Sequence, residues 1–274
     1  MQLFALIAIT MCAFAANSVL SRMGIFAFGM DPLGFSGVRL AAGAGMLGLL
    51  VGLRGGWPTV DRSRIITSAT LLIYLVPFSI AYLTLPSGVG ALILFGVVQI
   101  TMFAGAAIAG ATPTLRQWGG MSVAMLGLGW LLWPSETLSL DARGVIFMII
   151  SGIGWGAFSL RGRGSRDPLG DMAVSFALLM PFAGILMAVG QGWSMIGVAL
   201  AVLAGAVSSG LGYALWYRVL PQIPATTGAV AQLSVPVIAI IAGAFLLSEV
   251  ITLDIVLASA VVLGGIAVAV LKRG

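Results

Sequence analysis

The chain has 274 residues, of which 60% are hydrophobic and only 8% are charged. Soluble domains carry about 25% charged residues, so this composition excludes an ordinary water-soluble protein. The net charge of +5 does not indicate nucleic-acid binding, because the arginines are scattered at the ends of apolar runs. There is no His, and Cys12 and Lys272 are the only residues of their kinds, so we expect no metal site, disulfide or cofactor.

Apolar runs broken by charges, Pro and Gly predict ten helices that cross a membrane. A span takes about 20 apolar residues, and lipid admits only helices or closed barrels. The alternation of apolar and polar residues typical of a barrel is absent. The first run lacks the basic start and cleavage site of a signal peptide, so we interpret it as a retained span. The predicted spans are residues 3–21, 33–53, 65–83, 87–109, 117–133, 144–160, 172–190, 195–217, 225–247 and 254–271.

The distribution of Lys and Arg predicts the orientation of these spans. If the N-terminus is cytoplasmic, Arg22, Arg39 and Arg143 lie outside and the remaining basic residues lie on the cytoplasmic side. We therefore expect a multi-pass protein of the inner (cell) membrane with both termini in the cytoplasm. Arg39, about two turns into its span, is expected to extend to the outer interface, and pairing with Asp31 is the alternative.

Two matches between the halves of the chain predict an internal duplication. Pro86–Ala106 aligns without a gap with Pro224–Ala244, and Asp31–Gly34 recurs as Asp167–Gly170. Chance similarity between apolar helices is the alternative, but two matches in the same order favour a repeat. The predicted fold is an all-α integral membrane protein with five-helix repeats at residues 1–137 and 138–274. Because five is odd, the second repeat is inverted, as in many transporters that bind substrate between their repeats.

The segment Phe245–Leu271, with its Ser248-Glu249 step and Gly-rich last helix, resembles the closing signature of the drug/metabolite transporter (DMT) superfamily. Ala13–Arg22 and Asp31–Gly43 are similar to the first two helices of its ten-helix EamA-type branch, and the chain is most like the aromatic amino acid exporters known as YddG. The resemblance implies export of small metabolites by alternating access. The first repeat has Gly110-Ala111 where the signature places its Glu.

Polar and aromatic side chains on one face of several spans predict a substrate cavity between the repeats. The clearest stripe is Tyr74, Phe78 and Tyr82, spaced four residues apart. Aromatic residues near span ends can instead be interface anchors, and amides within the membrane can instead join helices by hydrogen bonds. The predicted substrate-binding residues are Phe14, Asn17, Tyr74, Phe78, Tyr82, Phe95, Gln99, Trp155, Ser159, Tyr213, Trp216, Tyr217 and Gln232.

Three prolines inside predicted spans, Pro77, Pro181 and Pro236, are candidate hinges. Each removes a backbone hydrogen bond and can kink its helix, and a static kink is the alternative. Small residues four apart at Ala41/Gly45, Gly48/Gly52 and Gly152/Gly156 indicate close helix packing.

The driving force is inferred from groups that the chain lacks. It has no Gly-Lys-Ser/Thr phosphate loop, so we expect neither ATP hydrolysis nor an ATPase subunit. All eight acids lie at or near predicted helix ends, which favours facilitated diffusion (a uniporter) over tight proton coupling. The uncharged aromatic lining favours zwitterionic or apolar substrates, so we predict export of amino acids, including aromatic ones, by a monomer or weak dimer. A proton-coupled exporter of cationic drugs, a channel and a membrane enzyme are the alternatives.

Overall fold

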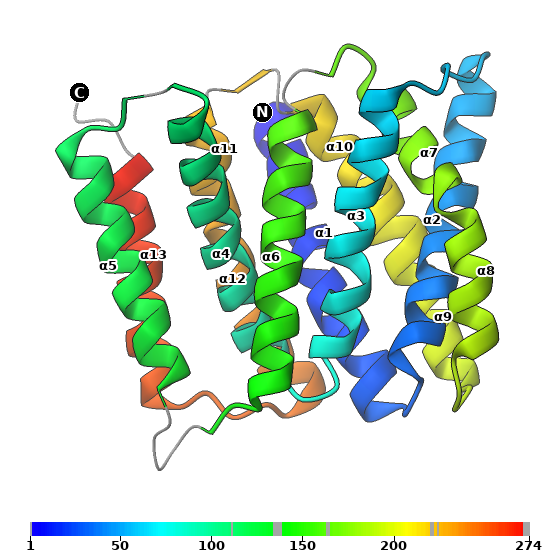
Figure 1. Ribbon diagram of the computed structural model, residues 1–274. Helices are drawn as coiled ribbons and strands as arrows, with labels where there is room; N and C mark the ends of the chain where they lie inside the picture. The colour runs from blue at the N-terminus through cyan, green and yellow to red at the C-terminus, as the bar shows by residue number, and fades with distance from the viewer. Residues whose placement is uncertain are drawn as a thin grey trace.

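The computed structural model describes residues 2–110, 112–133, 139–162, 165–219, 222–223 and 225–270. This part of the chain is almost entirely helical and contains no strand (Figure 1). Its elements are α1 (Gln2–Arg22), η1 (Met23–Ala27), α2 (Pro32–Arg54), α3 (Arg62–Ala81), α4 (Ser87–Ile108), α5 (Leu115–Leu132), α6 (Ala142–Gly162), α7 (Pro168–Leu178), α8 (Met180–Val189), α9 (Met195–Leu203), η2 (Ala204–Leu211), α10 (Gly212–Val219), α11 (Ala225–Gln232), α12 (Ser234–Leu247) and α13 (Leu253–Val270). The elements η1 and η2 are π-helical turns; η1 extends α1, and η2 joins α9 to α10.

Eight helical segments in the described ranges are long and apolar enough to cross a membrane, and the bent pair α7 and α8 adds a ninth. Helix α5, which covers the predicted span at 117–133, is not among them. Its first turn carries Arg116 and Gln117, which shortens its apolar part. The count of ten spans therefore stays a prediction.

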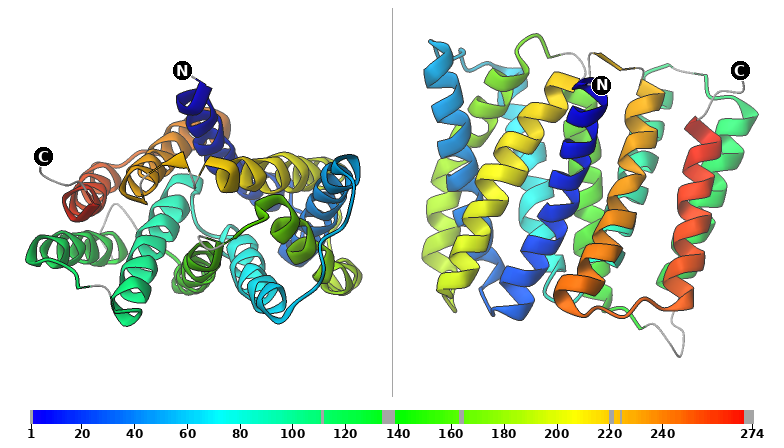
Figure 2. Two further views of the ribbon diagram at one scale, coloured as in Figure 1. Left: turned by 90° about the horizontal axis from the view of Figure 1, so that it is seen from above. Right: turned by 180° about the vertical axis from the view of Figure 1, so that it is seen from behind.

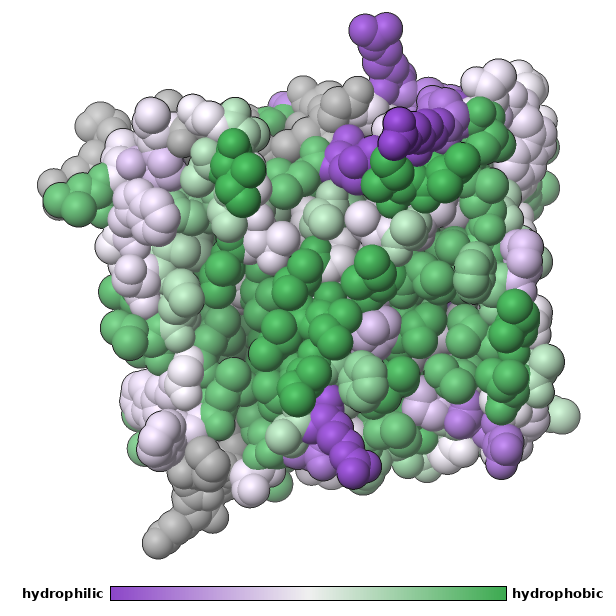
Figure 3. All heavy atoms as spheres, viewed as in Figure 1, coloured by the Kyte–Doolittle hydropathy of each residue, from purple (hydrophilic) through white to green (hydrophobic). Residues whose placement is uncertain are grey.

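The surface of the molecule is apolar where a soluble protein would be polar. Figure 3 shows apolar residues across the middle of one face, with hydrophilic residues gathered toward its upper and lower edges. Large apolar side chains are exposed on many helices, for example Phe4, Leu53, Ile108, Leu126 and Phe245. Soluble monomers rarely expose contiguous apolar patches beyond a few hundred Å². The protein is accordingly a multi-pass membrane protein.

The two copies of Asp-Pro-Leu-Gly each begin a helix. The Asp31 carboxylate accepts hydrogen bonds from the backbone N–H groups of Leu33 and Gly34 at the start of α2, and Asp167 accepts one from Gly170 at the start of α7. An Asp cap followed by Pro favours a helix start, because the carboxylate satisfies free N–H groups and Pro fixes φ. Helix α2 begins at the lower edge and α7 at the upper edge (Figure 1).

Successive long helices run in alternating directions, so that α1 begins and α13 ends at the same edge (Figures 1 and 2). Helices α5 and α13 pack side by side at one end of the molecule, and α2, α8 and α9 pack together at the other. Between them, α6 packs on α3 and α4, and α1 packs on α4, α10 and α12. The functional candidates described below lie in this middle group.

The three candidate hinge prolines occupy different surroundings. Pro77 lies inside α3, which continues past it. Pro181 is the second residue of α8, directly after a 42° bend, and Pro236 is the third residue of α12, after the break at Leu233. Pro interrupts a helix because it has no N–H and its ring clashes with the preceding turn. Movement at these positions stays a prediction.

Glycines allow close helix contacts, but not everywhere that the spacing predicted. A Cβ on Gly152 or Gly156 would lie 2.7 Å from side chains of α4, so close packing of α6 is confirmed there. On α2 the prediction was wrong, since Gly45 and Gly52 face no neighbouring atom within 4 Å. Close contacts on α2 fall instead at Gly37, where a Cβ would lie 2.7 Å from Met187 on α8, and at Gly43, where it would lie 2.5 Å from the ring of Phe176 on α7.

The contact of α5 with α13 gives a matched pair of stability predictions. A Cβ on Gly265 would lie 2.5 Å from the backbone nitrogen of Ala124, whereas the adjacent Gly264 faces no atom within 4 Å. We expect Gly265→Ala to lower the free energy of unfolding by about 1–3 kcal/mol, as overpacking does. Gly264→Ala should leave it unchanged or slightly raised. Thermal unfolding of the two purified variants in detergent measures these changes. Equal stability of Gly265→Ala and Gly264→Ala would contradict the close contact at Gly265.

Candidate functional site

A cluster of aromatic rings lies among α1, α3, α6 and α10, well away from the ends of α1 and α6. Trp155 is its centre, with ring centroids at 4.7 Å from Tyr213, 4.8 Å from Tyr74, 5.4 Å from Phe158 and 5.9 Å from Phe14. All five side chains are buried. Helix α6 can approach α3 here because Gly154, next to Trp155, packs directly on the α3 backbone.

A small cavity lies against this cluster, and seven of the thirteen predicted substrate-binding residues line it. We call it the central cavity. Its volume is about 10 Å³, which is about the minimum for one water molecule. The prediction of an open central chamber is therefore wrong for this conformation, because side chains fill the space. The lining residues are Phe14, Asn17, Ser18, Tyr74, Phe78, Leu94, Phe95, Trp155 and Tyr213.

The other six predicted residues are buried but do not line the central cavity. They are Tyr82, Gln99, Ser159, Trp216, Tyr217 and Gln232. Tyr82 packs edge-on against Phe78 at 4.8 Å and donates its hydroxyl to the Ser87 carbonyl at 3.3 Å. Trp216 packs edge-on against Phe14 at 5.8 Å. All six are buried, so the three aromatic residues among them do not face lipid as interface anchors.

Arg39 lies directly behind two tyrosines of the central cavity. Its Nη2 donates to the hydroxyl oxygens of Tyr74 at 3.0 Å and Tyr213 at 3.2 Å, and its Nε donates to Ser209 Oγ at 3.1 Å. The guanidinium also lies 4.9 Å from the ring centroid of Phe78, in cation–π contact. Asn17 Nδ2 donates to the Tyr74 hydroxyl at 2.9 Å, so the network joins α1, α2, α3 and the η2–α10 segment.

The backbone of η2 holds this network in place. Gly205 packs so closely on α2 that a Cβ there would lie 2.3 Å from the carbonyl oxygen of Arg39. This contact requires glycine and brings Ser209, one turn further on, to the guanidinium. π-Helical turns such as η2 are rare and often occur at functional sites.

The position of Arg39 corrects two predictions. The side chain is fully buried, so it neither extends to the outer interface nor pairs with Asp31. The interior is therefore not uncharged. Arg39 lies near the beginning of α2, and this suggested a position at the membrane interface. Its partners on α3 and α10 are distant in sequence, and only folding brings them to Arg39.

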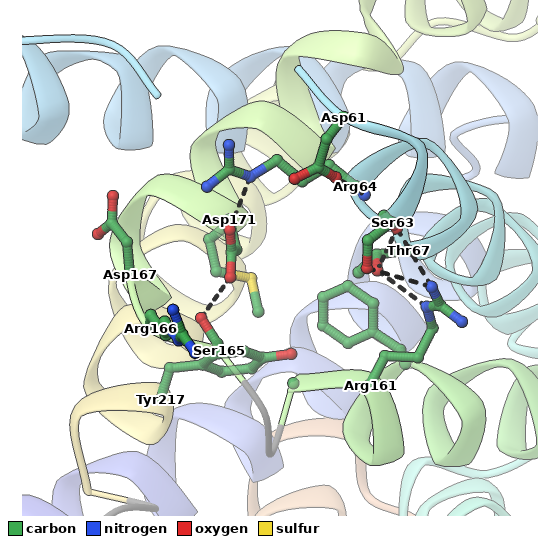
Figure 4. Close-up of a pocket in the computed structure, with 13 residues that line it drawn as sticks. Asp61, Ser63, Arg64, Thr67, Arg161, Ser165, Arg166, Asp167, Asp171 and Tyr217 are labelled. Carbon is green, nitrogen blue, oxygen red and sulfur yellow. Dashed lines mark hydrogen bonds and ion pairs between the residues drawn. The ribbon is translucent and has the colours of Figure 1, made fainter. Parts of the chain in front are cut away.

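A larger pocket, of about 410 Å³, opens at the edge that carries the two termini (Figure 4). We call it the vestibule. It lies among the ends of α3, α6, α7 and α10, and of the predicted substrate-binding residues only Tyr217 lines it. The vestibule is lined by Asp61, Ser63, Arg64, Thr67, Phe158, Arg161, Gly162, Ser165, Arg166, Asp167, Asp171, Met172 and Tyr217.

The vestibule walls carry an ion pair, and aromatic rings separate the vestibule from the central cavity. Arg64 Nε lies 2.7 Å from Asp171 Oδ1, and Arg161 donates to Thr67 Oγ1 at 3.1 Å on the other wall (Figure 4). Phe158 lines the vestibule and also stacks on Trp155, and Tyr217 lies 6.0 Å from Phe158. These two rings therefore stand between the vestibule and the central cavity.

One vestibule carboxylate gives a prediction about pH. Hydrogen bonding to Arg54, at 2.9 Å between Nη2 and Oδ2, holds the pKa of Asp167 below its ordinary value. The ion pair is exposed and contributes little to stability, whereas the cap on α7 contributes about 1 kcal/mol. Because the pKa of Asp167 is lowered in the folded chain, this stabilisation is complete above about pH 4, the pKa of Asp in an unfolded chain. It is lost as the pH falls through the pKa of Asp167 in the folded chain.

We therefore expect Asp167→Ala to lower the unfolding temperature at neutral pH, with the difference from the unmodified chain shrinking below about pH 4. Arg54→Ala should remove most of this pH dependence and keep the helix cap. Thermal unfolding between neutral pH and pH 3 measures both variants. If the difference in unfolding temperature between Asp167→Ala and the unmodified chain grows on acidification, the lowered pKa of Asp167 is contradicted.

At the opposite edge, Glu249, which follows α12, joins several helices. Its carboxylate accepts from Ser87 N–H at 2.8 and 2.9 Å and from Ser87 Oγ at 2.6 Å, at the start of α4. Arg22 Nε lies 3.6 Å from it, and Arg22 Nη1 donates to the Tyr82 and Leu83 carbonyls. We call this set the Glu249 closure. It ties α1, the α3–α4 turn and α4 to the segment between α12 and α13.

The sequence resemblance singled out Glu249 but gave no partner for it. Its carboxylate can reach α4 because Gly243 is small, since a Cβ there would lie 2.3 Å from Oε2. Ser248, just before it, has a positive φ of 54°, which turns the chain out of α12. Ser87, Gly243 and Arg22 were not predicted to act together, because they come from three separate helices.

The fold and the site define a helical multi-pass membrane protein with a buried aromatic and polar centre. Residues 142–271 match the model of the EamA-like transporter family. Over 97% of its length the chain is 39% identical to an uncharacterised protein of Pseudomonas aeruginosa, PA1977, and covers 93% of that protein. It is 23% identical to an uncharacterised transporter of Archaeoglobus fulgidus, over 89% of this chain and 90% of the other. The chain belongs to the EamA-like transporter family.

A solved crystal structure, described only as that of a protein, superposes on 97% of this chain and 98% of its own with a TM-score of 0.68. The sequence identity is 17%, so the match shows likeness of fold alone.

Proposed function

We propose that the protein exports amino acids, including aromatic ones, across the inner membrane by alternating access. The substrate enters from the vestibule on the cytoplasmic side, passes Phe158 and Tyr217, and is held at the central cavity. It leaves when the Glu249 closure opens. The central cavity is too small for an amino acid in this conformation, so binding requires the surrounding rings to rotate.

One observation carries the proposal. Aromatic and polar side chains from α1, α3, α4, α6 and α10 converge on one buried point, with a pocket leading toward it from one edge and ion-paired polar contacts closing the other. Ligand sites combine apolar walls with a few convergent polar groups. Unequal closure at the two edges is what one state of an alternating carrier requires, and it argues against an open channel.

Inverted repeats at residues 1–137 and 138–274 remain part of the proposal, and the packing supports them. An inverted duplication pairs α1 with α6, α2 with α7–α8, α3 with α9–α10, α4 with α11–α12, and α5 with α13. If each helix is replaced by its counterpart in the other repeat, the contacts of α6 with α3 and α4 correspond to contacts of α1 with α10 and α12. Helix α1 does pack against α10 and α12. The start of α2 at one edge and of α7 at the other fits the same relation.

The placement of acids favours facilitated diffusion over proton coupling. Seven of the eight acids lie in the described residues, and each lies in a loop, at a helix cap or in a first turn. Glu136 lies outside those residues. Proton-driven carriers generally keep an ionisable acid within the membrane.

Counterflow in proteoliposomes tests the proposal. Vesicles containing the purified protein and unlabelled phenylalanine should take up labelled phenylalanine transiently, and protein-free vesicles should not. Labelled amino acids of other side-chain classes then define selectivity. Uptake driven uphill by a pH gradient alone would overturn facilitated diffusion, and absence of counterflow with every amino acid would overturn amino acid export.

A further inference from the structure

We infer that Arg39 and the hydroxyl of Tyr213 form a carboxylate-binding site at the central cavity. This inference rests on the proposed function and assigns residues to the acidic group of the transported molecule. The predicted substrate is then a small zwitterion or monocarboxylate with an apolar side chain.

The positive charge of Arg39 is buried among neutral groups. Arg39 is fully buried, and its partners in the described part of the chain are the neutral groups of Ser209, Tyr74, Tyr213 and Phe78, with no carboxylate among them. By contrast, Arg22, Arg54 and Arg64 each lie within 4 Å of an acid near a helix end. A buried charge is costly unless it is paired. The centre of the protein therefore favours an anionic group and disfavours a cationic drug.

Arg39 and Trp155 each have buried hydrogen-bond donors without a partner among the described residues. Arginine has five N–H donors, and three of these bonds are made, by Nε and Nη2. Buried Nη1 has no partner among the described residues, which leaves two N–H groups free. Trp155 Nε1, on the cavity wall, is likewise buried without a partner.

The tyrosine pair contributes a further donor. The Tyr74 oxygen accepts from Asn17 and from Arg39, so both of its lone pairs are used and its proton goes to Tyr213, 2.9 Å away. The Tyr213 oxygen then accepts from Tyr74 and from Arg39. Its own proton is used by neither of these two partners, and Ser209 is the other side chain within hydrogen-bond reach of this hydroxyl.

The unpartnered donors and acceptor at the central cavity match the two charged groups of a zwitterion. Donors on Arg39, Trp155 and Tyr213 suit the two oxygens of a carboxylate, and Arg–carboxylate pairs are commonly bidentate. Asn17 Oδ1, on the same cavity wall, is a buried acceptor without a partner in the described structure and suits an ammonium group. Rotation of the Tyr213 ring away from Arg39 would open the guanidinium to the ligand.

Three ligands of similar shape test the site: phenylalanine, phenylalaninamide, which lacks the carboxylate, and 3-phenylpropionate, which lacks the ammonium group. Binding to the purified full chain in detergent is measured by titration calorimetry. We expect phenylalanine and phenylpropionate to bind at least about tenfold more tightly than the amide, the effect of one charged hydrogen-bonded pair.

Arg39→Gln should reduce the preference for carboxylates to within about threefold, and Arg39→Lys should keep part of it because the charge remains. Tyr213→Phe should weaken phenylpropionate binding while the ring packing is kept. Arg143→Gln, at an exposed arginine on α6, is the matched control and should change nothing. If Arg39→Gln does not fold, as judged by gel filtration, the other two variants and the ligand series decide the question.

Equal binding of the amide and the acid by the unmodified chain, or an undiminished preference in the folded Arg39 variants, would overturn this site. Counterflow judges the proposed function separately. Counterflow of phenylalanine with no dependence on Arg39 would leave export standing and remove the carboxylate site. Arg39-dependent binding of phenylpropionate without counterflow of any amino acid would keep the site and remove amino acid export. Binding of none of the three ligands would overturn the site for aromatic carboxylates.

Discussion

Replacing Trp155 with alanine is expected to abolish counterflow and to lower the free energy of unfolding by about 3–5 kcal/mol, the usual cost of truncating a large buried aromatic residue. Trp155 contacts four other rings, at centroid distances of 4.7–5.9 Å. Its removal would leave a hole at the point where α1, α3, α6 and α10 meet.

Substitution of Trp155 should impair transport more than its loss of folding stability alone explains. Trp155→Phe keeps an aromatic ring beside Tyr74 and Tyr213 but removes the unpartnered Nε1 donor. We expect this variant to fold with a smaller loss of stability and to show reduced substrate affinity. Thermal unfolding and counterflow, measured on the same reconstituted samples, separate the two effects.

Trp133 provides the control, since it is 75% exposed at the end of α5. Trp133→Ala should leave both stability and counterflow close to those of the unmodified chain. If Trp155→Ala transports normally, the aromatic cluster is structural and the substrate path lies elsewhere.

Glu249→Ala is expected to open the edge opposite the termini. The substitution leaves Arg22, 7% exposed, without its carboxylate, and removes the group that caps the first N–H of α4. Removing one partner of a buried ion pair costs about 3–5 kcal/mol. Because this pair is partly exposed, we expect Glu249→Ala to cost about 3 kcal/mol or less. At about 1.4 kcal/mol per tenfold, a loss near 3 kcal/mol shifts the closed-to-open ratio by about two powers of ten.

Thiol labelling measures this shift. A single cysteine at Ser18, on the wall of the central cavity, is introduced after the native exposed Cys12 is replaced by serine. A membrane-impermeant reagent added on the side opposite the termini should label Ser18→Cys slowly, and much faster when Glu249→Ala is also present. Gly243→Ala, which would push the carboxylate off Ser87, should act in the same direction.

Asp254→Ala is a useful comparison, because Asp254 lies in the first turn of α13, at the same edge as Glu249 but outside the closure. It should not speed labelling from that side. Unchanged labelling in Glu249→Ala would show that Glu249 only caps α4.

Local sequence signals were sufficient for much of the fold. The two Asp-Pro-Leu-Gly segments, recognised in the sequence as a repeat, each begin a helix, because an N-cap and the proline after it act within four residues. The four-residue spacing of Tyr74, Phe78 and Tyr82 predicted that their rings lie in one row, since 3.6 residues make a turn, and the rings are in contact along α3 and its C-cap. The absence of charge over long runs determined that the chain enters the membrane.

Other features depended on contacts between distant residues, which local patterns do not encode. Spacing alone suggested close packing at Gly45 and Gly52, but whether a helix faces a neighbour there depends on how the other helices are placed. Whether the central cavity is open also depends on side-chain packing, since the same rings can line a chamber or fill it. In this conformation they fill it.

The sequence by itself determined that this is an all-helical membrane protein and which side chains could face its interior. Only the tertiary structure decided that Arg39 lies among them and that Glu249 reaches the start of α4. The physical reason is that a charge tolerates the interior only when donors and acceptors from other helices surround it. Those partners, Ser209 for Arg39 and Ser87 for Glu249, lie 170 and 162 residues away along the chain.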